Sequence, residues 1–560
     1  MKISKLVTTL ALAGVATLAV APQIAIAQAA PMKPADLKAT ADAIFNAAYS
    51  ADAPGAAVVV TRGGRVVYES ARGLADVEAR RLITPDTPFP LGSIVKQITA
   101  ATVLKLVEEG RISLDDPISR FFPDWPQPAA KSTARQLLNH TSGVEDYTKI
   151  PGWVANNRTR SFTTQELLDL IRSLPAKTEP GTAWEYNNAG YVLLGAIVEK
   201  ASGQRWHEAV AARVTAPLGL ATIAPPGPAA NATAVARGYR REGGRIEPVP
   251  PTHPSMAFSA GGLVGSARDL ARFSNALHGG RLVSPTLYKE MTSPARLADG
   301  STRPYGFGFR LQQLLDRQVI VHGGAGAGLD TDAVYIPSED IYVAVLANTE
   351  DAGMDASTVT RRLAAAALGT PFPMFSRAEV DMRAIEPLFG LYKAVNGPAL
   401  RFFSRDGKLY VGEGDRETEA FAAGGDRFFF GPDDLKWIRL VRKQDGAHLL
   451  EAHFPNRAKA ATAVRSGPVP PPFALPQELL RSYAGKYQTE TLAVSVQLGA
   501  DGHLTITPAG QNPLPLRPVS KTEFRIDGTP MRLEFHPENG KVDRFTLYRG
   551  ARELHGKRVP

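Results

Sequence analysis

Strand-like and helix-like patterns follow one another along the first two thirds of the chain. Residues 57–69 form two β-branched runs around Gly63-Gly64, a pattern typical of an antiparallel hairpin. Apolar residues then recur with a helical period over 93–110, 164–173, 188–202 and 266–278. Strand-like runs return at 305–311, 319–321, 332–336 and 341–346. This order predicts an α/β (α+β) fold in which both ends contribute to one antiparallel sheet and a helical subdomain is inserted between them.

After about residue 370 the pattern changes to short strands separated by glycine turns. Leu388-Phe389-Gly390-Leu391-Tyr392 is similar to Tyr483-Ala484-Gly485-Lys486-Tyr487, and an Asp-Gly turn follows each at the same interval, as Asp406-Gly407 and Asp501-Gly502. Phe428 and Phe524 keep nearly the same offset. We therefore predict two small antiparallel β-barrel-like modules, at 383–463 and 477–560, joined by a stiff Pro-rich linker at 464–476.

The first residues predict a targeting segment. Lys2 and Lys5 precede an apolar run over 6–21, and Ala25-Ile26-Ala27 has the small-x-small pattern of a signal peptidase site. The run is short for a membrane span, which needs about 20 residues. Residues 1–27 are therefore predicted to be a cleavable signal peptide, with an uncleaved anchor as the alternative. The mature chain is expected to be periplasmic or secreted, without an integral membrane span, and its first domain to cover 28–372.

Composition excludes several classes of protein. Hydrophobic residues make up 44% and charged residues 21% of the 560, which fits globular domains. The absence of cysteine excludes disulfides, thiolate nucleophiles and cysteine-ligated metals. The net charge of +9 comes from 64 basic and 55 acidic residues without a basic run, so no nucleic-acid partner is predicted. The ten histidines are scattered and form no His-Glu-x-x-His motif, so no metal is predicted.

Ser93 and Lys96 lie three positions apart at the start of a predicted helix and so project from one face. A serine hydroxyl is a poor nucleophile until a base takes its proton, and a lysine amine one turn away can do so. The alternative is that Ser93 caps the helix and Lys96 faces solvent. The apolar neighbours Ile94, Val95 and Ile98 favour a buried lysine.

Two further motifs bring polar groups to the ends of predicted elements. Tyr186 and Asn188 stand where a loop enters a helix, so a phenol and an amide can face one cavity; the alternative is a helix cap beside a core tyrosine. His322 and Gly324 run out of an apolar strand, where glycine leaves room for a substrate backbone. The glycine-rich run after His322 leads into a strand rather than a helix, so it is not a dinucleotide loop, and no cofactor is predicted.

Together, Ser93-x-x-Lys96, Tyr186-x-Asn188 and His322-x-Gly324 resemble the three signature motifs of the serine β-lactamase and penicillin-binding protein family, in its class C-like branch. Supporting phrases are Leu137-Leu138-Asn139-His140-Thr141-Ser142-Gly143, Pro180-Gly181, Ala260-Gly261-Gly262-Leu263 and Tyr305-Gly306-Phe307-Gly308. The resemblance spans about 35–368 and implies a β-lactamase-like transpeptidase fold. His-Gly-Gly in place of Lys-Thr-Gly, and the two tail modules, look most like D-aminopeptidases and D,D-peptidases with C-terminal β-barrel modules.

The resemblance implies an exported serine hydrolase that works through an acyl-enzyme. Ser93, Lys96 and Tyr186 would be catalytic, and the substrate would bind at Asn188, His322, Gly324 and Ala325. Asn188 would orient the substrate amide, and the N–H groups of Ser93 and Ala325 would form the oxyanion hole. Lys96 and Tyr186 would share the deprotonation of Ser93, and which of them is the base stays open. His322 is expected to hold Tyr186 by a hydrogen bond or by charge.

The expected substrates are D-amino-acid-containing peptides, peptidoglycan fragments among them, cleaved as by a D-aminopeptidase or a D,D-carboxypeptidase. The alternatives are a carboxylesterase and then a β-lactamase acting on a lactam. An α/β-hydrolase esterase is excluded, because no Gly-x-Ser-x-Gly occurs. A cell-wall or penicillin-binding protein without turnover is the alternative that is not an enzyme. A homodimer is left open.

Overall fold

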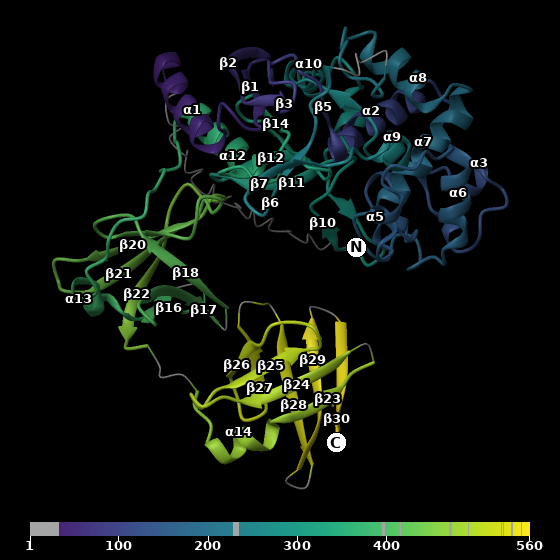
Figure 1. Ribbon diagram of the computed structural model, residues 1–560. Coiled ribbons are helices and arrows are strands. Elements are labelled where there is room, and N and C mark those ends of the chain that lie inside the picture. The colour runs from purple at the N-terminus through teal and green to yellow at the C-terminus, as the bar shows by residue number, and fades with distance from the viewer. Residues whose placement is uncertain are drawn as a thin grey trace, which may run out of the picture.

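A computed structural model describes residues 33–227, 234–394, 398–414, 416–469, 473–490, 492–527, 529, 531–538, 541–549 and 552–560. It contains an N-terminal unit, from α1 to α12, and two small barrels that follow it (Figure 1). The signal peptide predicted at 1–27 lies outside the described residues. No helix in the described part of the chain has the length and apolar character needed to cross a membrane.

A six-stranded antiparallel sheet joins the two ends of the N-terminal unit. Its strand order is β11-β12-β13-β14-β1-β2. The strands are β1 (Ala56–Arg62), β2 (Arg65–Arg72), β11 (Arg310–Leu314), β12 (Arg317–Ala325), β13 (Asp330–Ile336) and β14 (Ile341–Ala347). Gly63 and Gly64 have φ values of 56° and 70°, as the tight turn of the β1–β2 hairpin requires. The prediction of one antiparallel sheet with helices inserted between its halves is confirmed.

Helices cover both faces of this sheet. On one face α12 (Ala356–Ala367) packs over β13 and β14, and α1 (Pro34–Ala48) packs against α12 and β2. On the other lie α2 (Val95–Glu108), α7 (Asn188–Ser202) and α10 (Ala267–His278), within the larger core. Two of the predicted helices, α6 (Thr164–Ser173) and α7, have the expected bounds. The helix α10 begins one residue later than predicted, because Ser266 is its N-cap and accepts a hydrogen bond from the Asp269 N–H.

Shorter elements complete the N-terminal unit. The remaining helices are α3 (Ile118–Phe121), α4 (Ala134–Leu138), α5 (Trp153–Asn157), α8 (Trp206–Val210), α9 (Pro254–Ala257) and α11 (Pro285–Met291). The short strands are β3 (Leu74–Asp76), β4 (Arg81–Leu82), β5 (Phe89–Pro90), β6 (Tyr239–Glu242), β7 (Arg245–Pro248), β8 (Val264–Gly265), β9 (Ala295–Arg296) and β10 (Thr302–Arg303). They form small two-stranded pairs outside the main sheet.

The strand predicted at 305–311 is wrong in its bounds, since β11 begins only at Arg310. The reason lies in Gly308, whose φ is +80°. A Cβ at Gly308 would lie 2.8 Å from the carbonyl carbon and oxygen of Lys96. The segment before β11 therefore turns to pass closely against the start of α2 instead of extending the sheet.

Each C-terminal module is a closed eight-stranded antiparallel barrel. The first contains α13 (Met382–Ile385), β15 (Gly390–Ala394), β16 (Leu400–Arg405), β17 (Lys408–Glu413), β18 (Arg416–Ala422), β19 (Arg427–Phe429), β20 (Trp437–Arg442), β21 (His448–His453) and β22 (Ala461–Gly467). The second contains α14 (Gln477–Tyr483), β23 (Gly485–Gln488), β24 (Ala493–Leu498), β25 (Leu504–Pro508), β26 (Leu514–Pro518), β27 (Glu523–Ile526), β28 (Arg532–Glu538), β29 (Lys541–Arg549) and β30 (Arg552–Val559). The predicted pair of barrel-like modules is confirmed.

The internal repeat has a structural counterpart in the first strand of each barrel. The Tyr392 hydroxyl donates to the Leu388 carbonyl at 2.6 Å, and the Tyr487 hydroxyl donates to the Tyr483 carbonyl at 2.8 Å. Both tyrosines are fully buried in their barrel cores. In the first barrel, β22 runs to Gly467 and so overlaps the start of the linker predicted at 464–476.

The first barrel contacts the N-terminal unit at the turn between β11 and β12. The N–H groups of Leu315 and Asp316 donate to the carbonyls of Pro455 and Asn456 at 2.9 and 3.0 Å, and the Ala458 N–H donates to the Asp316 carboxylate at 3.0 Å. Leu315 and Asp316 have φ values of 50° and 63°, which cost about 1–2 kcal/mol per non-glycine residue. The hydrogen bonds to the barrel help to offset this cost.

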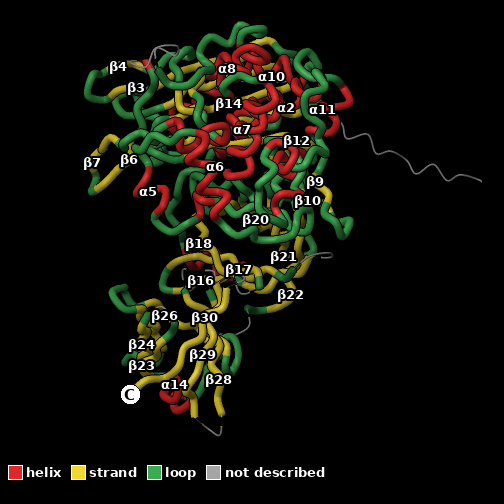
Figure 2. The backbone as a smooth tube through the Cα atoms, turned by 90° about the vertical axis from the view of Figure 1, so that its right-hand side faces the viewer, coloured by secondary structure: helices red, strands yellow, loops and turns green. Residues whose placement is uncertain are grey.

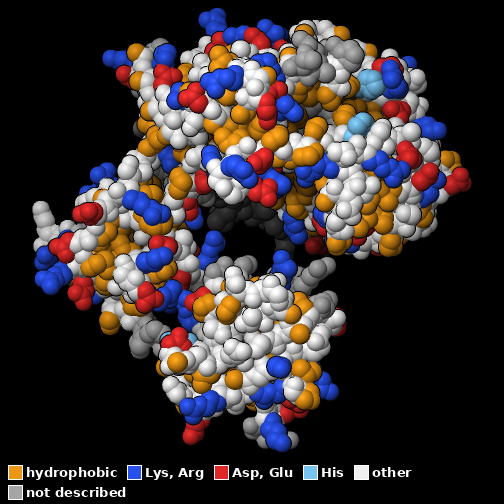
Figure 3. All heavy atoms as spheres, in the orientation of Figure 1, with side chains coloured by type: hydrophobic (Ala, Val, Ile, Leu, Met, Phe, Trp, Pro, Cys, Tyr) orange, Lys and Arg blue, Asp and Glu red, His pale blue; other side chains and the backbone are white. Residues whose placement is uncertain are grey.

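Two further contacts connect the three bodies in chain order. The N–H of Asp355, the N-cap of α12, donates to the Asp433 carboxylate of the first barrel at 2.7 Å. Arg517 of the second barrel donates to Glu417 of the first. Figure 2 shows the barrels following one another on one side of the N-terminal unit, and Figure 3 shows an opening bounded by all three bodies.

Asp316→Gly is expected to loosen the first barrel without weakening the turn that it contacts. Glycine adopts the left-handed conformation freely, but the carboxylate that accepts the Ala458 N–H is lost. Loss of about 1 kcal/mol raises the open population about five-fold. Trypsin cleavage at the exposed Arg377, between the N-terminal unit and the first barrel, should accelerate to that extent.

Asp406→Gly is the matched control, because Asp406 has a φ of 51° in an exposed turn within the first barrel. It should leave cleavage at Arg377 unchanged. Equal cleavage rates in both variants would contradict a role for the Asp316 contact.

Candidate active site

Ser93 and Lys96 share the first turn that leads into α2. Ser93 lies in the short 3-10 helix η1 (Gly92–Ile94), directly before α2. Gly92 has a φ of +52°, a conformation that favours glycine. Lys96 Nζ lies 3.1 Å from Ser93 Oγ. The structure thus brings these two residues together. Lys96 does not face solvent, so the alternative in which Ser93 only caps the helix and Lys96 is solvated does not hold.

The Lys96 amine is fully buried and contacts three oxygens. These are Ser93 Oγ at 3.1 Å, Asn188 Oδ1 at 2.9 Å and the Ala260 carbonyl at 2.9 Å. Burial lowers the pKa of the Lys96 amine to about 7; the Asp146 carboxylate acts in the opposite direction, and the Arg310 charge lowers the pKa further. At neutral pH a large fraction of the amine is therefore unprotonated and can accept the proton of the hydroxyl that it touches.

The Tyr186 ring lies close both to this amine and to the Arg310 guanidinium. Lys96 Nζ is 4.9 Å from the ring centroid, and the guanidinium carbon of Arg310 is 5.4 Å from the same centroid. Burial raises the pKa of the Tyr186 phenol to about 12, although the Ser93 hydroxyl and the Arg310 charge act in the opposite direction. The phenol therefore keeps its proton at neutral pH.

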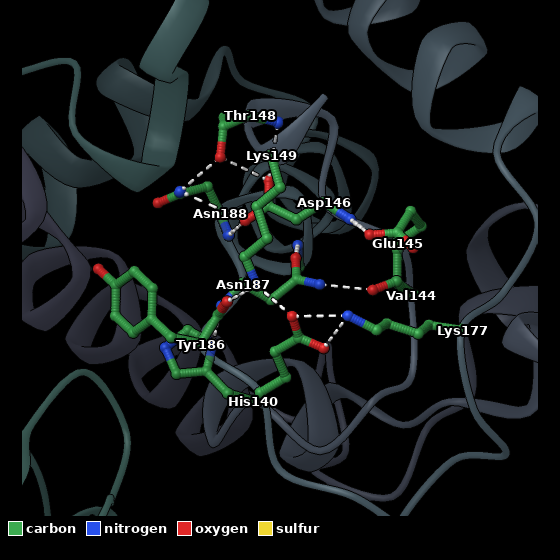
Figure 4. A network of polar contacts seen from close by, with 12 residues as sticks. His140, Val144, Glu145, Asp146, Thr148, Lys149, Lys177, Tyr186, Asn187 and Asn188 are labelled. Atoms are coloured by element: carbon green, nitrogen blue, oxygen red, sulfur yellow. Dashed lines mark hydrogen bonds and ion pairs between the residues drawn. The ribbon is translucent and has the colours of Figure 1, made fainter. Parts of the chain in front are cut away.

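Asn188 is the first residue of α7, and its amide oxygen accepts a hydrogen bond from Lys96 Nζ. Figure 4 shows its amide nitrogen beside Thr148. The helix cap is Asn187 instead, whose side-chain oxygen accepts the Gly190 N–H at 2.7 Å. This division of roles leaves Asn188 Oδ1 free to accept from Lys96. The Asn188 amide nitrogen donates to Thr148 Oγ1 at 3.0 Å, and the Asn188 backbone N–H donates to Asp146 at 2.8 Å.

His322 is buried on β12 and contacts Tyr305 more closely than Tyr186. Its Nδ1 lies 2.7 Å from the Gly323 carbonyl, which can only accept, so Nδ1 carries the proton and Nε2 accepts from the Tyr305 hydroxyl at 3.0 Å. Burial lowers the pKa of His322 to about 3, so the ring is neutral. The expectation that His322 holds Tyr186 by a hydrogen bond or by charge is wrong. The two rings only pack, with centroids 6.0 Å apart.

Gly324 and Ala325 lie where β12 passes the Ser93 turn. A Cβ on Gly324 would lie 2.3 Å from the Leu91 carbonyl oxygen and 3.0 Å from the Ser93 nitrogen. Gly324 is therefore needed for close packing between two backbone segments, whereas the sequence pattern had predicted that this glycine leaves room for a substrate backbone. A Cβ on Gly92 would lie 3.4 Å from the Ala325 nitrogen, so the backbone before Ser93 passes close to the backbone of Ala325.

Sequence reasoning missed several residues that border this site. His140 accepts the Asn187 N–H at 3.2 Å, and its ring centroid lies 4.5 Å from those of both Tyr186 and Tyr305. His140 and Tyr305 occur in the supporting phrases of the sequence and could have been singled out there. Asp146 and Arg310 stand in no motif. Within the described residues, no group of three or more His, Cys, Asp or Glu side chains could hold a metal ion.

A family model described as Beta-lactamase matches residues 38–368. The chain belongs to the β-lactamase family. Two relatives extend the similarity beyond the matched domain. Penicillin-binding protein 4* of Bacillus subtilis is 27% identical over 66% of this chain and 87% of its own length. D-aminopeptidase of Brucella melitensis is 28% identical over 74% of this chain and 79% of its own length. As a member of this family, the protein is an enzyme, a serine hydrolase.

One solved structure has a similar overall fold. The octameric penicillin-binding protein homologue from Pyrococcus abyssi has a TM-score of 0.53 and 22% identity, and the match covers 94% of this chain and 100% of that one. At this identity the similarity is one of fold.

Gly324→Ala is expected to displace the Ser93 turn of this β-lactamase-family enzyme, because the new Cβ would overlap the Leu91 carbonyl. A displacement of about 1 Å at a reacting atom can cost about 100-fold in rate. Labelling of Ser93 by a fluorophosphonate should slow to that extent in a folded variant. Gly323→Ala is the neighbouring control, since its Cβ would meet Thr331 and Asp332 of β13 instead. Equal labelling of Gly324→Ala and wild type would contradict this account.

Proposed function

We propose that the protein hydrolyses amide bonds in D-amino-acid-containing peptides through an acyl-enzyme on Ser93. The observation that carries this proposal is the 3.1 Å contact between Ser93 Oγ and the buried Lys96 amine. The relatives described as D-aminopeptidase and penicillin-binding protein support the substrate class.

Lys96 is the base that activates Ser93 in this proposal. A neutral amine has two N–H groups and one lone pair, which match two acceptors, Asn188 Oδ1 and the Ala260 carbonyl, and one hydroxyl donor, Ser93. The proton moves from Ser93 to Lys96 as Oγ attacks the carbonyl carbon. The C–N bond then breaks as the Tyr186 phenol gives its proton to the leaving amine and takes up the proton that Lys96 had received, which leaves both groups as they started. Water then hydrolyses the ester. The Ser93 and Ala325 N–H groups stabilise the oxyanion.

Arg310 favours a substrate with a free carboxylate. Its side chain is exposed at the start of β11 beside the Tyr186 ring, and it forms no ion pair with any residue that the structure describes. A guanidinium binds a carboxylate with two parallel hydrogen bonds. This feature favours the D,D-carboxypeptidase type over the D-aminopeptidase type, which must bind a free ammonium group.

Export and the domain boundaries complete the proposal. The pattern of residues 1–27 supports a cleaved signal peptide and a periplasmic or secreted enzyme. We take 28–372 as the hydrolase domain and 477–560 as the second β-module. The first module, predicted at 383–463, extends to Gly467 because β22 ends there, so the linker predicted at 464–476 shortens to 468–476.

A substrate panel tests the proposed activity. It contains D- and L-alanine p-nitroanilide, an N-acylated D-Ala-D-Ala peptide and its C-terminal amide, a cephalosporin reporter and a short-chain p-nitrophenyl ester. We expect the D-Ala-D-Ala acid to be hydrolysed with the highest kcat/KM, about tenfold or more above its amide, because the amide cannot pair with Arg310.

Ser93→Ala should abolish turnover of every compound in the panel, and survival of hydrolysis would refute the assignment of the nucleophile. Preference for the ester would indicate a carboxylesterase, and preference for the cephalosporin a β-lactamase. Labelling by a fluorescent penicillin without turnover would indicate a binding protein.

The pH profile tests Lys96 as the base. With a Lys96 pKa of about 7, kcat/KM should rise about tenfold per pH unit below pH 7 and level off above it, because only the neutral amine accepts the Ser93 proton. Lys96→Arg should remove the activity, since a guanidinium stays protonated. Lys105→Arg, on the same helix and paired with Glu108, is the control and should keep the profile. An acidic limb centred near pH 4 would point to a carboxylate base instead.

A further inference from the structure

The segment 144–149 holds the backbone and side chains of the loop that carries Tyr186 and Asn188 (Figure 4). The Asn187 amide nitrogen donates to the Val144 carbonyl at 2.5 Å, and the Asn188 N–H donates to the Asp146 carboxylate at 2.8 Å. Lys149 Nζ donates to the Tyr186 carbonyl at 2.8 Å. Each residue of 186–188 is thus bound by a different residue of the segment. The loop position therefore depends on this segment as well as on α7.

Asp146 is the centre of these contacts. Its side chain is almost fully buried, at 1% exposure. One carboxylate oxygen accepts from the Thr148 N–H and hydroxyl at 3.0 and 2.8 Å. The other accepts from the Asn188 N–H at 2.8 Å and from its amide nitrogen at 3.4 Å. A buried carboxylate is stable only when it is paired or hydrogen-bonded in this way.

These contacts fix which way the Asn188 amide faces. Thr148 donates its hydroxyl proton to Asp146, so its oxygen is left to accept from the Asn188 amide nitrogen at 3.0 Å. With the nitrogen held by Thr148 and Asp146, the amide oxygen faces Lys96 Nζ at 2.9 Å. The reverse orientation would set two donors against each other at Lys96 and an oxygen against a carboxylate at Asp146.

We propose that Asp146 is a positioning residue of this active site, which orients the Asn188 amide toward Lys96 and places a fixed negative charge beside the Ser93–Lys96 pair. The proposal rests on the proposed function for its kinetic consequence, but the orientation of Asn188 can be tested without it. Asp146 itself contacts neither Ser93 nor Lys96 in the described hydrogen bonds, so its effect passes through Asn188 and through its charge.

Few charged groups lie near the Lys96 amine besides the Asp146 carboxylate in the part of the chain that the structure describes. The titratable and charged groups that face Lys96 are Tyr186, Tyr191, His140, His322, Arg310 and Asp146. Burial raises the pKa of both tyrosines and lowers the pKa of both histidines, so these four are neutral at pH 7. Arg310 and Asp146 then act on the Lys96 amine in opposite directions.

Asp146→Asn tests the proposal, because it removes the charge with little change in shape. The pH midpoint of Ser93 labelling by a fluorophosphonate should move about half a unit or more below that of the wild type, since the protonated amine loses its nearby anion. The kcat for the preferred substrate should fall about 10- to 100-fold through misorientation of Asn188. A crystal structure should show the Asn188 amide turned away from Lys96.

Thr148→Val separates orientation from charge. It removes the hydroxyl that binds the Asn188 amide nitrogen but leaves the Asp146 carboxylate. We expect a lower kcat with an unchanged pH midpoint.

Asp269→Asn is the matched control for the loss of a buried aspartate. Asp269 is 3% exposed and accepts the Thr222 N–H and hydroxyl at 2.8 and 2.7 Å, in contact with none of the residues 186–188. It should lower thermal stability without moving the pH midpoint of labelling. A wild type that is not labelled at Ser93 would refute the proposed function, whereas the structure of Asp146→Asn would still report on Asn188.

The proposal is overturned if Asn188 keeps its contact with Lys96 in that structure, or if the pH midpoint of Asp146→Asn stays at the wild-type value. Should Asp146→Asn fail to fold, Thr148→Val decides. Unchanged kcat and an unmoved Asn188 amide in that variant would overturn the positioning role.

Discussion

The burial of one lysine amine is the constraint on which the site depends. An ammonium group without water is unfavourable unless oxygens surround it, and here three segments far apart in the sequence supply them at Ser93, Asn188 and Ala260. The same burial lowers the pKa of the Lys96 amine to about 7, so that the amine can accept or release a proton near neutral pH. Two glycines, Gly308 and Gly324, let the backbone pack closely against the Ser93 turn and the start of α2, where Lys96 is buried.

Much of this arrangement could be predicted from local patterns. The spacing of Ser93 and Lys96 on a helix, and the position of Tyr186 before another, follow from periodicity, because neighbours in the sequence stay neighbours on a helix. Asp146 and Arg310 could not be found in this way. Each reaches the site from a loop or a strand end whose place is decided by tertiary packing, and an isolated Asp or Arg usually marks solvent-facing surface.

His322 shows where a correct motif led to a wrong contact. Its place in the strand was evident from the apolar run before it, but its partner was decided by Tyr305, which the close passage of Gly308 brings against the ring. The barrels were predictable for the opposite reason. The same sequence pattern occurs once in each barrel, which made the pair recognisable. The equivalent glycines Gly390 and Gly485 each leave space for an arginine of the last strand of the barrel, Arg465 and Arg558 respectively.

The turn of Leu315 and Asp316 has a consequence for the order of folding. A two-residue turn fixes the register of its hairpin, and a slip of one residue would point the His322 side chain to the other face of the sheet. Both residues hold a left-handed conformation that the first barrel helps to stabilise. The barrel is synthesised after the hairpin that it holds. We therefore expect the folding of the first barrel, which lies outside the sheet, to add to the stability of this register after the hairpin has been synthesised.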